Sequence, residues 1–206
     1  MKSSAWYKSF AELSMSESEG SSYKRTFKHR RSKFAIIAPH GGGIEPGTTE
    51  IARAIAGSWF SYYTFDGLRQ EGNELLHITS SLFDDPQCLQ LISDSKFVIA
   101  IHGCSGDDQA IHIGGLHEEL KIRLIDAMLI AGFDARPAGA EYAGVQPQNI
   151  CNRGCSGQGV QLEISEGLRR AMFKSLKRQD RKITTHVFQN FVTCVRRELM
   201  SAAGGA

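Results

Sequence analysis

The stretch that decides the fold is FAIIAPHGGGIEPGTTE, residues 34–50. Its first five residues, 34–38, are an unbroken run of apolar side chains, which predicts a strand covered on both faces of its sheet. Glycines and a proline follow, and a helix is predicted from about residue 46 to residue 57, because proline suits a first helical turn and glycine a helix end. His40 and Glu45 lie on the loop between them. In α/β sheets such loops, outside the carboxyl ends of strands, form binding sites.

The composition is that of one globular domain. The chain has 206 residues, of which 41% are hydrophobic and 22% are charged, and its formal net charge is +2. Such a small charge gives no reason to expect nucleic-acid binding, and no apolar stretch has membrane-spanning length. The N-terminus lacks the uninterrupted apolar run of a signal peptide. We therefore expect a protein that is made in the cytoplasm without a signal peptide and that binds neither nucleic acid nor membrane.

Strands alternate with helices along most of the chain. This order predicts a single α/β domain with a mostly parallel mixed sheet flanked by helices. The expected division is a polar N-terminal segment at residues 1–33, ending in a solvated basic run, a domain at 34–200, and a frayed tail at 201–206. Further strands are expected within residues 58–68, 75–86, 96–106, 109–113 and 159–165, and further helices at 86–93, 115–131, 168–176 and 184–200.

Three ionisable residues lie within or just after apolar strands. His40 follows one, His102 ends KFVIAIH, and Glu163 lies within GVQLEIS. Parallel strands would bring them to one edge of the sheet, where His40, Glu45 and His102 would form a two-histidine, one-carboxylate zinc site with an open position for water. Glu163 would then be the general base. The spacing is equally compatible with two loop histidines that bind only the backbone.

Cysteine offers a different chemistry. The five cysteines are an odd number with no spacing typical of a disulfide framework, which fits a reducing compartment. Cys104 lies two residues after His102, so the two side chains share one face of a strand, and a thiol nucleophile with a histidine base is an alternative to zinc. A small buried thiol is the commoner role for such a cysteine.

Several separated blocks resemble the poly-γ-glutamate hydrolase family of bacteriophages and bacilli. They are APHGGGIEPGTTEIA, SYYTFDG, LHITSSLFDDP, VIAIHGC and GVQLEIS, and the resemblance extends over roughly residues 34–199. It implies a fold like that of zinc carboxypeptidases, Zn²⁺ held by His40, Glu45 and His102, and Glu163 as the catalytic carboxylate. Members cleave γ-amide bonds of poly-γ-glutamate, the capsule polymer of bacilli. Such a protein would act outside the cell, after release by lysis or by non-classical export.

The same resemblance bears on how the substrate is held. In carboxypeptidases an Asn-Arg pair before the second histidine grips a terminal carboxylate, whereas Asn152–Arg153 here follows it, which fits cleavage within a polymer. Each residue of that polymer keeps a free α-carboxylate, and arginine binds carboxylates in a bidentate way. Arg153 is therefore our predicted substrate-binding residue. The other candidates are Arg53, Arg69 and Arg136. Two alternatives stay open: a zinc amidase for another acyl-amino acid or peptide, and a non-catalytic polymer-binding module. The sequence predicts no oligomeric state.

Overall fold

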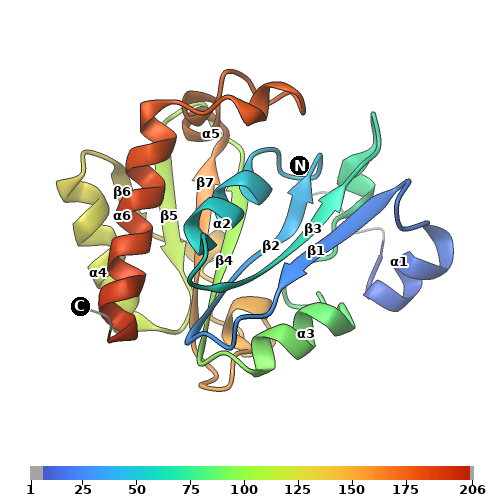
Figure 1. Cartoon of the computed structure of the whole chain (residues 1–206), viewed down its shortest axis with the longest axis horizontal. Coiled ribbons are helices and arrows are strands. Elements are labelled where there is room, and N and C mark those ends of the chain that lie inside the picture. Colours follow the sequence, from blue (N-terminus) through green and yellow to red (C-terminus); the bar gives the residue numbers. More distant parts are fainter. Residues whose placement is uncertain (1–6, 205–206) are drawn as a thin grey trace.

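A computed structural model describes residues 7–204, which form one sheet covered by helices on both faces (Figure 1). Its seven strands run in the order β1-β3-β2-β4-β7-β5-β6. Neighbouring strands are parallel except in the pairs β1–β3 and β5–β7, which are antiparallel. This arrangement confirms the predicted single α/β domain with a mostly parallel mixed sheet. The strands are β1 (Tyr23–Lys28), β2 (Phe34–Gly42), β3 (Ser61–Gly67), β4 (Phe97–Cys104), β5 (Ala110–Gly114), β6 (Asp134–Pro137) and β7 (Gly159–Ser165).

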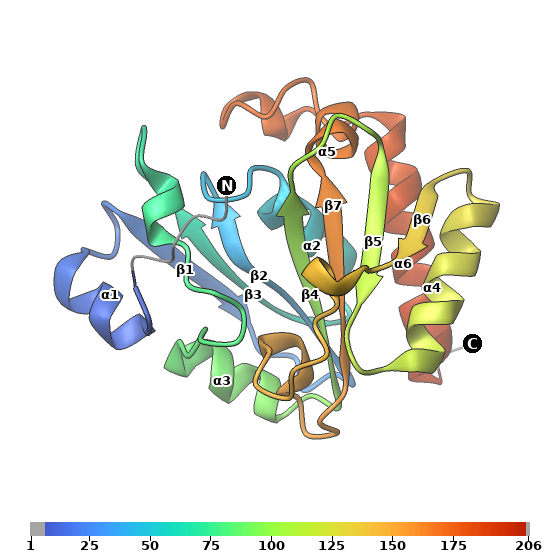
Figure 2. The same cartoon turned by 180° about the vertical axis from the view of Figure 1, so that it is seen from behind.

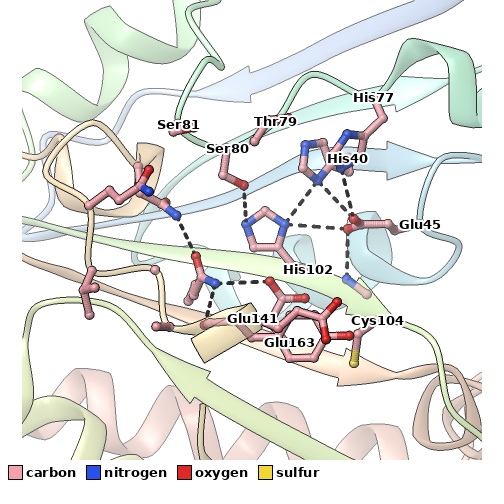
Figure 3. A pocket seen from close by; sticks show the side chains of 18 of the residues that line it. His40, Glu45, His77, Thr79, Ser80, Ser81, His102, Cys104, Glu141 and Glu163 are labelled. Atoms are coloured by element: carbon pink, nitrogen blue, oxygen red, sulfur yellow. Dashed lines mark hydrogen bonds and ion pairs between the residues drawn. The ribbon is translucent and has the colours of Figure 1, made fainter. Parts of the chain in front are cut away.

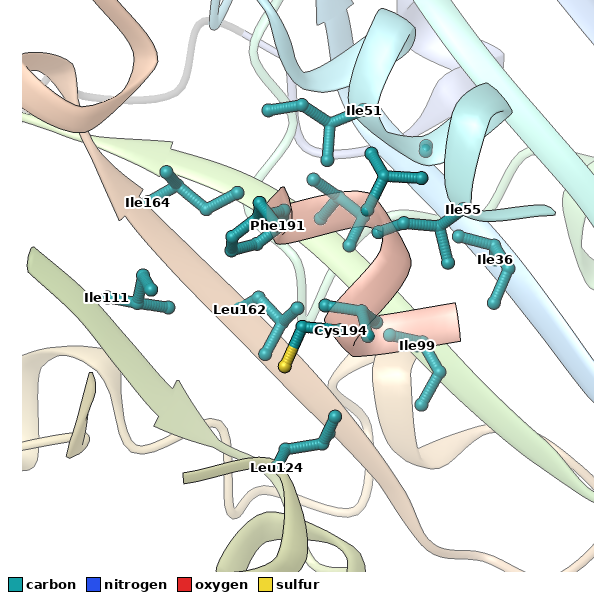
Figure 4. Packing of buried hydrophobic residues seen from close by; sticks show 14 of the residues in the cluster. Ile36, Ile51, Ile55, Ile99, Ile111, Leu124, Leu162, Ile164, Phe191 and Cys194 are labelled. Atoms are coloured by element: carbon teal, nitrogen blue, oxygen red, sulfur yellow. The ribbon is translucent and has the colours of Figure 1, made fainter. Parts of the chain in front are cut away.

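The helices form two layers. The first layer, in front in Figure 1, packs on the sheet through a large apolar cluster that includes Ile51, Leu162 and Phe191 (Figure 4). On the other face, seen in Figure 2, a smaller cluster joins α1 and α3 to the sheet through Leu13 and Leu91. The first layer is α2 (Thr48–Ala56), α4 (Glu118–Ile130), α5 (Glu166–Met172) and α6 (His186–Ala203), and the second is α1 (Phe10–Ser16) and α3 (Pro86–Ser93).

The two faces of β7 differ in chemistry, and this difference positions the site. Val160, Leu162 and Ile164 pack into the larger apolar cluster. Because successive side chains of a strand point to opposite faces, Gln161 and Glu163 point to the face that carries α1 and α3. On that face the end of β7 is covered by a loop, which includes short 3₁₀ turns at Ala140–Tyr142 and Ile150–Asn152.

The described part of the N-terminal segment differs from its prediction. Residues 24–28 of the expected solvated basic run belong to β1, which pairs with β3 at the edge of the sheet. Its first residue, Tyr23, stacks on Phe65 with ring centroids 5.0 Å apart, and α1 adds Leu13 to the same core. The apolar side chains of this segment are few, but they are spaced so that one face of α1 and one end of β1 can be buried. The segment therefore packs with the domain, which differs from the division expected at residue 33.

Three other stretches also depart from expectation. Residues 75–86 form no strand; a 3₁₀ turn at Asn73–Leu76 is followed by irregular chain up to the start of α3. No strand was expected between residues 132 and 158, which are rich in Gly, Pro and Ala, but they contain β6, which has too few residues to show a period. The tail is helical as far as Ala203, and residues 205–206 lie outside the described residues. Across residues 7–204, no helix has both the length and the apolar character needed to cross a membrane.

Candidate metal centre and active site

A bulge at the end of β2 sets the position of His40. The pairing of β2 with β3 shifts register between Ala38 and Gly41, next to Pro39, which has no N–H to donate to a ladder. Gly42 then takes a positive φ of 67°, and a Cβ there would lie 2.5 Å from the carbonyl oxygen of Gly67. Only glycine fits this close approach. The side chain of His40 is thereby turned into the face of the sheet that carries the cavity described below.

A tight turn brings Glu45 back to His40. The backbone N–H of Glu45 donates to the carbonyl of His40 at 2.9 Å, which closes the loop. One carboxylate oxygen of Glu45, Oε1, lies 3.0 Å from Nδ1 of His40, and the other, Oε2, accepts from the backbone N–H of Gly103 at 2.9 Å. The carboxylate of Glu45 thus links the end of β2, through His40, to the end of β4, through Gly103.

His102 and Glu163 lie beside each other on neighbouring strands. They are register partners in the parallel pairing of β4 with β7. Nδ1 of His102 lies 3.2 Å from Nδ1 of His40 and 3.7 Å from Oε2 of Glu45. The side chains of His40, Glu45 and His102 therefore converge, with Glu163 next to them (Figure 3). The structure brings together the residues that the sequence pattern singled out for metal binding and base catalysis.

A third histidine, His77, was missed in the sequence. Its ring lies against the ring of His40, with centroids 3.9 Å apart and planes at 31°, and its Nε2 is 3.9 Å from Oε1 of Glu45. His40, Glu45 and His77 each offer a ligand atom within 4.8 Å of the others, so these three also form a possible metal site. The neighbouring His40 and burial lower the pKa of His77 to about 3. The available signal was LLH, an apolar pair before a histidine, which is similar to the apolar runs before His40 in β2 and His102 in β4.

Burial and neighbouring charges shift the pKa values of the two carboxylates, Glu45 and Glu163, in opposite directions and raise that of the Cys104 thiol. Burial opposes ionisation of Glu45, but His40 and His102 outweigh it and hold the pKa of Glu45 well below its usual range. Burial raises the pKa of Glu163. Burial, and then the charge of Glu163, raise the pKa of Cys104 to about 11. The thiol of Cys104 is thus protonated near neutral pH, which is unfavourable for a nucleophilic role.

The site opens into a cavity of about 520 Å³. Its walls come from the ends of β2, β4 and β7, from residues 77–81 and from the loop at 140–149. Its lining is: His40, Glu45, His77, Thr79, Ser80, Ser81, His102, Gly103, Cys104, Ala140, Glu141, Tyr142, Ala143, Gly144, Val145, Gln146, Asn149, Gln161 and Glu163. None of these lining residues, all within the described chain, is an arginine or a lysine.

The arginines predicted to bind substrate lie elsewhere. Arg153 is exposed, and its guanidinium donates to the backbone carbonyl of Phe83 at 3.1 Å. Arg153 does not line the cavity. It follows the 3₁₀ turn at Ile150–Asn152, and the sequence does not reveal the direction in which that turn leads the chain. The other three candidates each have a carboxylate partner away from the cavity: Arg53 with Asp66, Arg69 with Glu17, and Arg136 with Asp134.

A buried arginine braces the strand ends from behind. Arg169 of α5 is 4% exposed and donates to three backbone carbonyls, those of Pro46 at 2.8 Å, Cys104 at 2.9 Å and Ile164 at 3.0 Å. A Cβ at Gly103 would lie 2.6 Å from this guanidinium, so a side chain there would displace Arg169 from its carbonyls. Since these carbonyls belong to the ends of β4 and β7 and to the loop after β2, Arg169 holds the chain segments that carry the site in fixed relative positions.

Comparisons with known proteins agree with this architecture. The chain matches the sequence profile of the family described as poly-gamma-glutamate hydrolase over residues 7–194. It is 37% identical over 180 residues to the UPF0714 protein YndL of Bacillus subtilis (strain 168), covering 86% of this chain and 71% of YndL. It is 39% identical over 189 residues to the SPbeta prophage-derived UPF0714 protein YoqZ of the same strain, covering 90% of this chain and 68% of YoqZ.

Two solved structures are similar along almost their whole length. A bacteriophage poly-gamma-glutamate hydrolase superposes with a TM-score of 0.94 at 31% identity, covering 98% of this chain and 99% of that one. A zinc-free structure of YndL superposes with a TM-score of 0.92 at 35% identity, covering 96% and 98%. The sequence profile and both structures extend over the strands that carry His40, His102 and Glu163. The chain belongs to the poly-gamma-glutamate hydrolase family.

Proposed function

We propose that this protein is a zinc-dependent hydrolase that cleaves γ-glutamyl amide bonds within poly-γ-glutamate. The observation that carries the proposal is the convergence of His40 Nδ1, His102 Nδ1 and the Glu45 carboxylate beside a half-buried carboxylate, Glu163. Family membership supports the reaction class, since the family is one of poly-γ-glutamate hydrolases.

The donor atoms fit a zinc ion. Nε2 of His40 lies 2.7 Å from the carbonyl oxygen of Ile78, which can only accept, so the proton of a neutral His40 is on Nε2 and Nδ1 offers a lone pair. Two nitrogens about 2.0–2.1 Å from one tetrahedral zinc ion lie roughly 3.3 Å apart. The distance between Nδ1 of His40 and Nδ1 of His102 is 3.2 Å. We therefore propose His102 rather than His77 as the ligand beside His40 and Glu45.

Glu163 has the position and the proton affinity of a general base. When bound, zinc polarises a carbonyl and lowers the pKa of a water molecule. Glu163 accepts the proton of the attacking water. It then delivers this proton to the nitrogen of the leaving amine, because that nitrogen must be protonated when the γ-amide bond breaks. Burial raises the pKa of Glu163, which increases its affinity for the transferred proton at neutral pH.

The cavity lining supports cleavage within the polymer. An arginine is the usual group for gripping a terminal carboxylate by two hydrogen bonds. None of the described residues that line the cavity is an arginine or a lysine, and its donors are hydroxyl, amide and imidazole groups. Such a lining has no group that would bind the end of a polymer chain in preference to an internal segment. The proposed place of action is outside the cell, where the polymer lies, after release by lysis or non-classical export.

The deciding experiment is incubation of purified poly-γ-glutamate with the protein, with and without a chelator, followed by sizing of the products. We expect the mean polymer length to fall early and the chelator to stop the reaction, with zinc restoring it. Release of single glutamate residues from otherwise full-length polymer would contradict internal cleavage. An intact polymer, under conditions in which the zinc-loaded protein cleaves other acyl-amino acids, would instead support the amidase alternative. An intact polymer with no cleavage of either kind would favour a polymer-binding module.

A further inference from the structure

Gln161 is a buried amide in the floor of the cavity that the proposed reaction does not use. It lies on β7 two residues before Glu163, so both side chains point to the same face of the sheet. The residue is only 4% exposed. A buried amide is costly unless its donors and its acceptor are satisfied, so the partners of Gln161 define what it does.

The amide of Gln161 makes three hydrogen bonds to residues of the cavity wall, and its Oε1 also accepts a longer one from Sγ of Cys151 at 4.0 Å. Its Nε2 donates to the carbonyl of Tyr142 at 2.9 Å and to Oε1 of Glu163 at 3.2 Å. Its Oε1 accepts from Nδ2 of Asn149 at 3.0 Å. The reverse orientation of the amide would set an oxygen against two acceptors, a carbonyl and a carboxylate. The orientation of Gln161 is therefore determined by its surroundings, with an N–H directed at Glu163.

Asn149 is itself held in place. Its Oδ1 accepts from the backbone N–H of Cys151 at 3.0 Å, which leaves its Nδ2 directed at Gln161. The cavity loop adds a steric limit, because a Cβ at Gly144 would lie 2.6 Å from the side chain of Gln161. Hydrogen bonds thus run from a fixed 3₁₀ turn through two amides to one oxygen of Glu163.

We propose that Gln161 is a positioning residue that holds the Glu163 carboxylate in the orientation needed for proton transfer. Its N–H occupies Oε1 of Glu163, and none of the hydrogen bonds found within residues 7–204 involves Oε2. Oε2 is thus the oxygen left to accept the proton of the attacking water. This role rests on the proposed function of Glu163, and it extends that function to a residue that takes no part in the proton transfer itself.

The kinetic test is a double-mutant cycle. Gln161→Met keeps the length of the side chain and removes the donor. We expect kcat on poly-γ-glutamate to fall by roughly 10- to 100-fold, since a misplacement of about 1 Å can cost that much, with KM within about twofold and full zinc content. In the Glu163→Gln background the same substitution should cause no further loss, because the group being positioned is gone. Equal losses in both backgrounds would overturn the proposal.

Two further variants separate positioning from folding. Gln158 is exposed and lies just before β7, so Gln158→Met is the matched control and should leave kcat unchanged. If Gln161→Met does not fold, Gln161→Leu replaces it, because it also removes the donor and adds no charge beside Glu163. A Gln161→Leu protein with wild-type kcat would contradict the proposal.

A structural measurement tests the idea independently of polymer cleavage. Crystal structures of the zinc-loaded wild type and of the Gln161→Met variant should be compared. In the variant we expect the Glu163 carboxylate to be rotated away from its wild-type orientation. An unmoved carboxylate in the variant would overturn the positioning role. A wild type that does not shorten poly-γ-glutamate contradicts the proposed function instead, and the crystallographic comparison still decides the role of Gln161.

Discussion

Nε2 of His40 and the backbone carbonyl oxygen of Ile78, 38 residues further along the chain, lie 2.7 Å apart. This contact engages Nε2 of His40, so Nδ1 is the ring nitrogen that is directed at Glu45 and His102. The irregular segment after the first 3₁₀ turn therefore does more than line the cavity. It orients one histidine through a backbone carbonyl and places a second histidine, His77, against the ring of the first.

The two possible histidine ligands can be told apart by metal content. We expect His102→Ala to lose bound zinc and activity, because one of three protein ligands is removed. His77→Ala should keep zinc close to one ion per chain, since Nε2 of His77 lies 3.9 Å from Oε1 of Glu45 and its ring packs on His40. Elemental analysis of both purified variants is the measurement. Full zinc in His102→Ala together with loss from His77→Ala would assign the site to His40, Glu45 and His77.

Replacing Glu163 by glutamine should abolish most turnover and spare metal binding. The substitution keeps the size and the contact with Gln161 but removes the base, and loss of a general base typically costs on the order of 10²–10⁴ in rate. Turnover of poly-γ-glutamate, zinc content and polymer affinity should be measured together. Near-normal turnover with zinc present would assign proton transfer to another carboxylate, such as Glu141, which also lines the cavity.

The pH dependence of kcat should show an acidic limb that is shifted upward. Glu163 must be ionised to act as a base, and burial raises its pKa. Activity should therefore fall as the pH drops through a value above the ordinary glutamate pKa of about 4.3. A pH profile of wild-type turnover, taken where the zinc content is constant, checks this prediction. An acidic limb at or below the ordinary value would show that Glu163 is not the titrating base.

Cys104 should be dispensable for chemistry. Its thiol lines the cavity, but burial raises its pKa to about 11, so the reactive thiolate is scarce at neutral pH. Cys104→Ser should retain most of the wild-type turnover, measured with the same polymer assay. An inactive Cys104→Ser that still binds zinc and melts at the wild-type temperature would support the thiol mechanism.

The N-terminal helix should contribute to the stability of the whole domain. Leu13 of α1 is fully buried, and Leu→Ala substitutions in a core typically lower the free energy of unfolding by about 2–5 kcal/mol. On the same helix Met15 is 81% exposed, so Met15→Ala is the matched control. It should change the free energy of unfolding by less than about 0.5 kcal/mol. Denaturant unfolding gives both values. Equal, small effects would mean that α1 is not part of the cooperative unit.

Where the apolar pattern is long, the sequence predicts the structure well. The predicted strand at residues 34–38 is the first part of β2, and the predicted helix at 86–93 matches α3 from end to end. The pattern is weak where an element is short or buries few side chains, as in β6 and α1. In these elements tertiary contacts supply the stability that local propensity does not.

The candidate site shows the same division. By itself the sequence determined that His40, His102 and Glu163 lie in or just after buried strands, because an apolar run followed by glycine specifies a strand end locally. Only the tertiary structure decided that these strands are neighbours, that the segment at residues 77–81 lines the same cavity, and that Arg153 does not line it. The physical reason is that strand order, register and loop direction depend on contacts between residues far apart in the chain. A one-residue change of register would turn His102 and Glu163 to the opposite face.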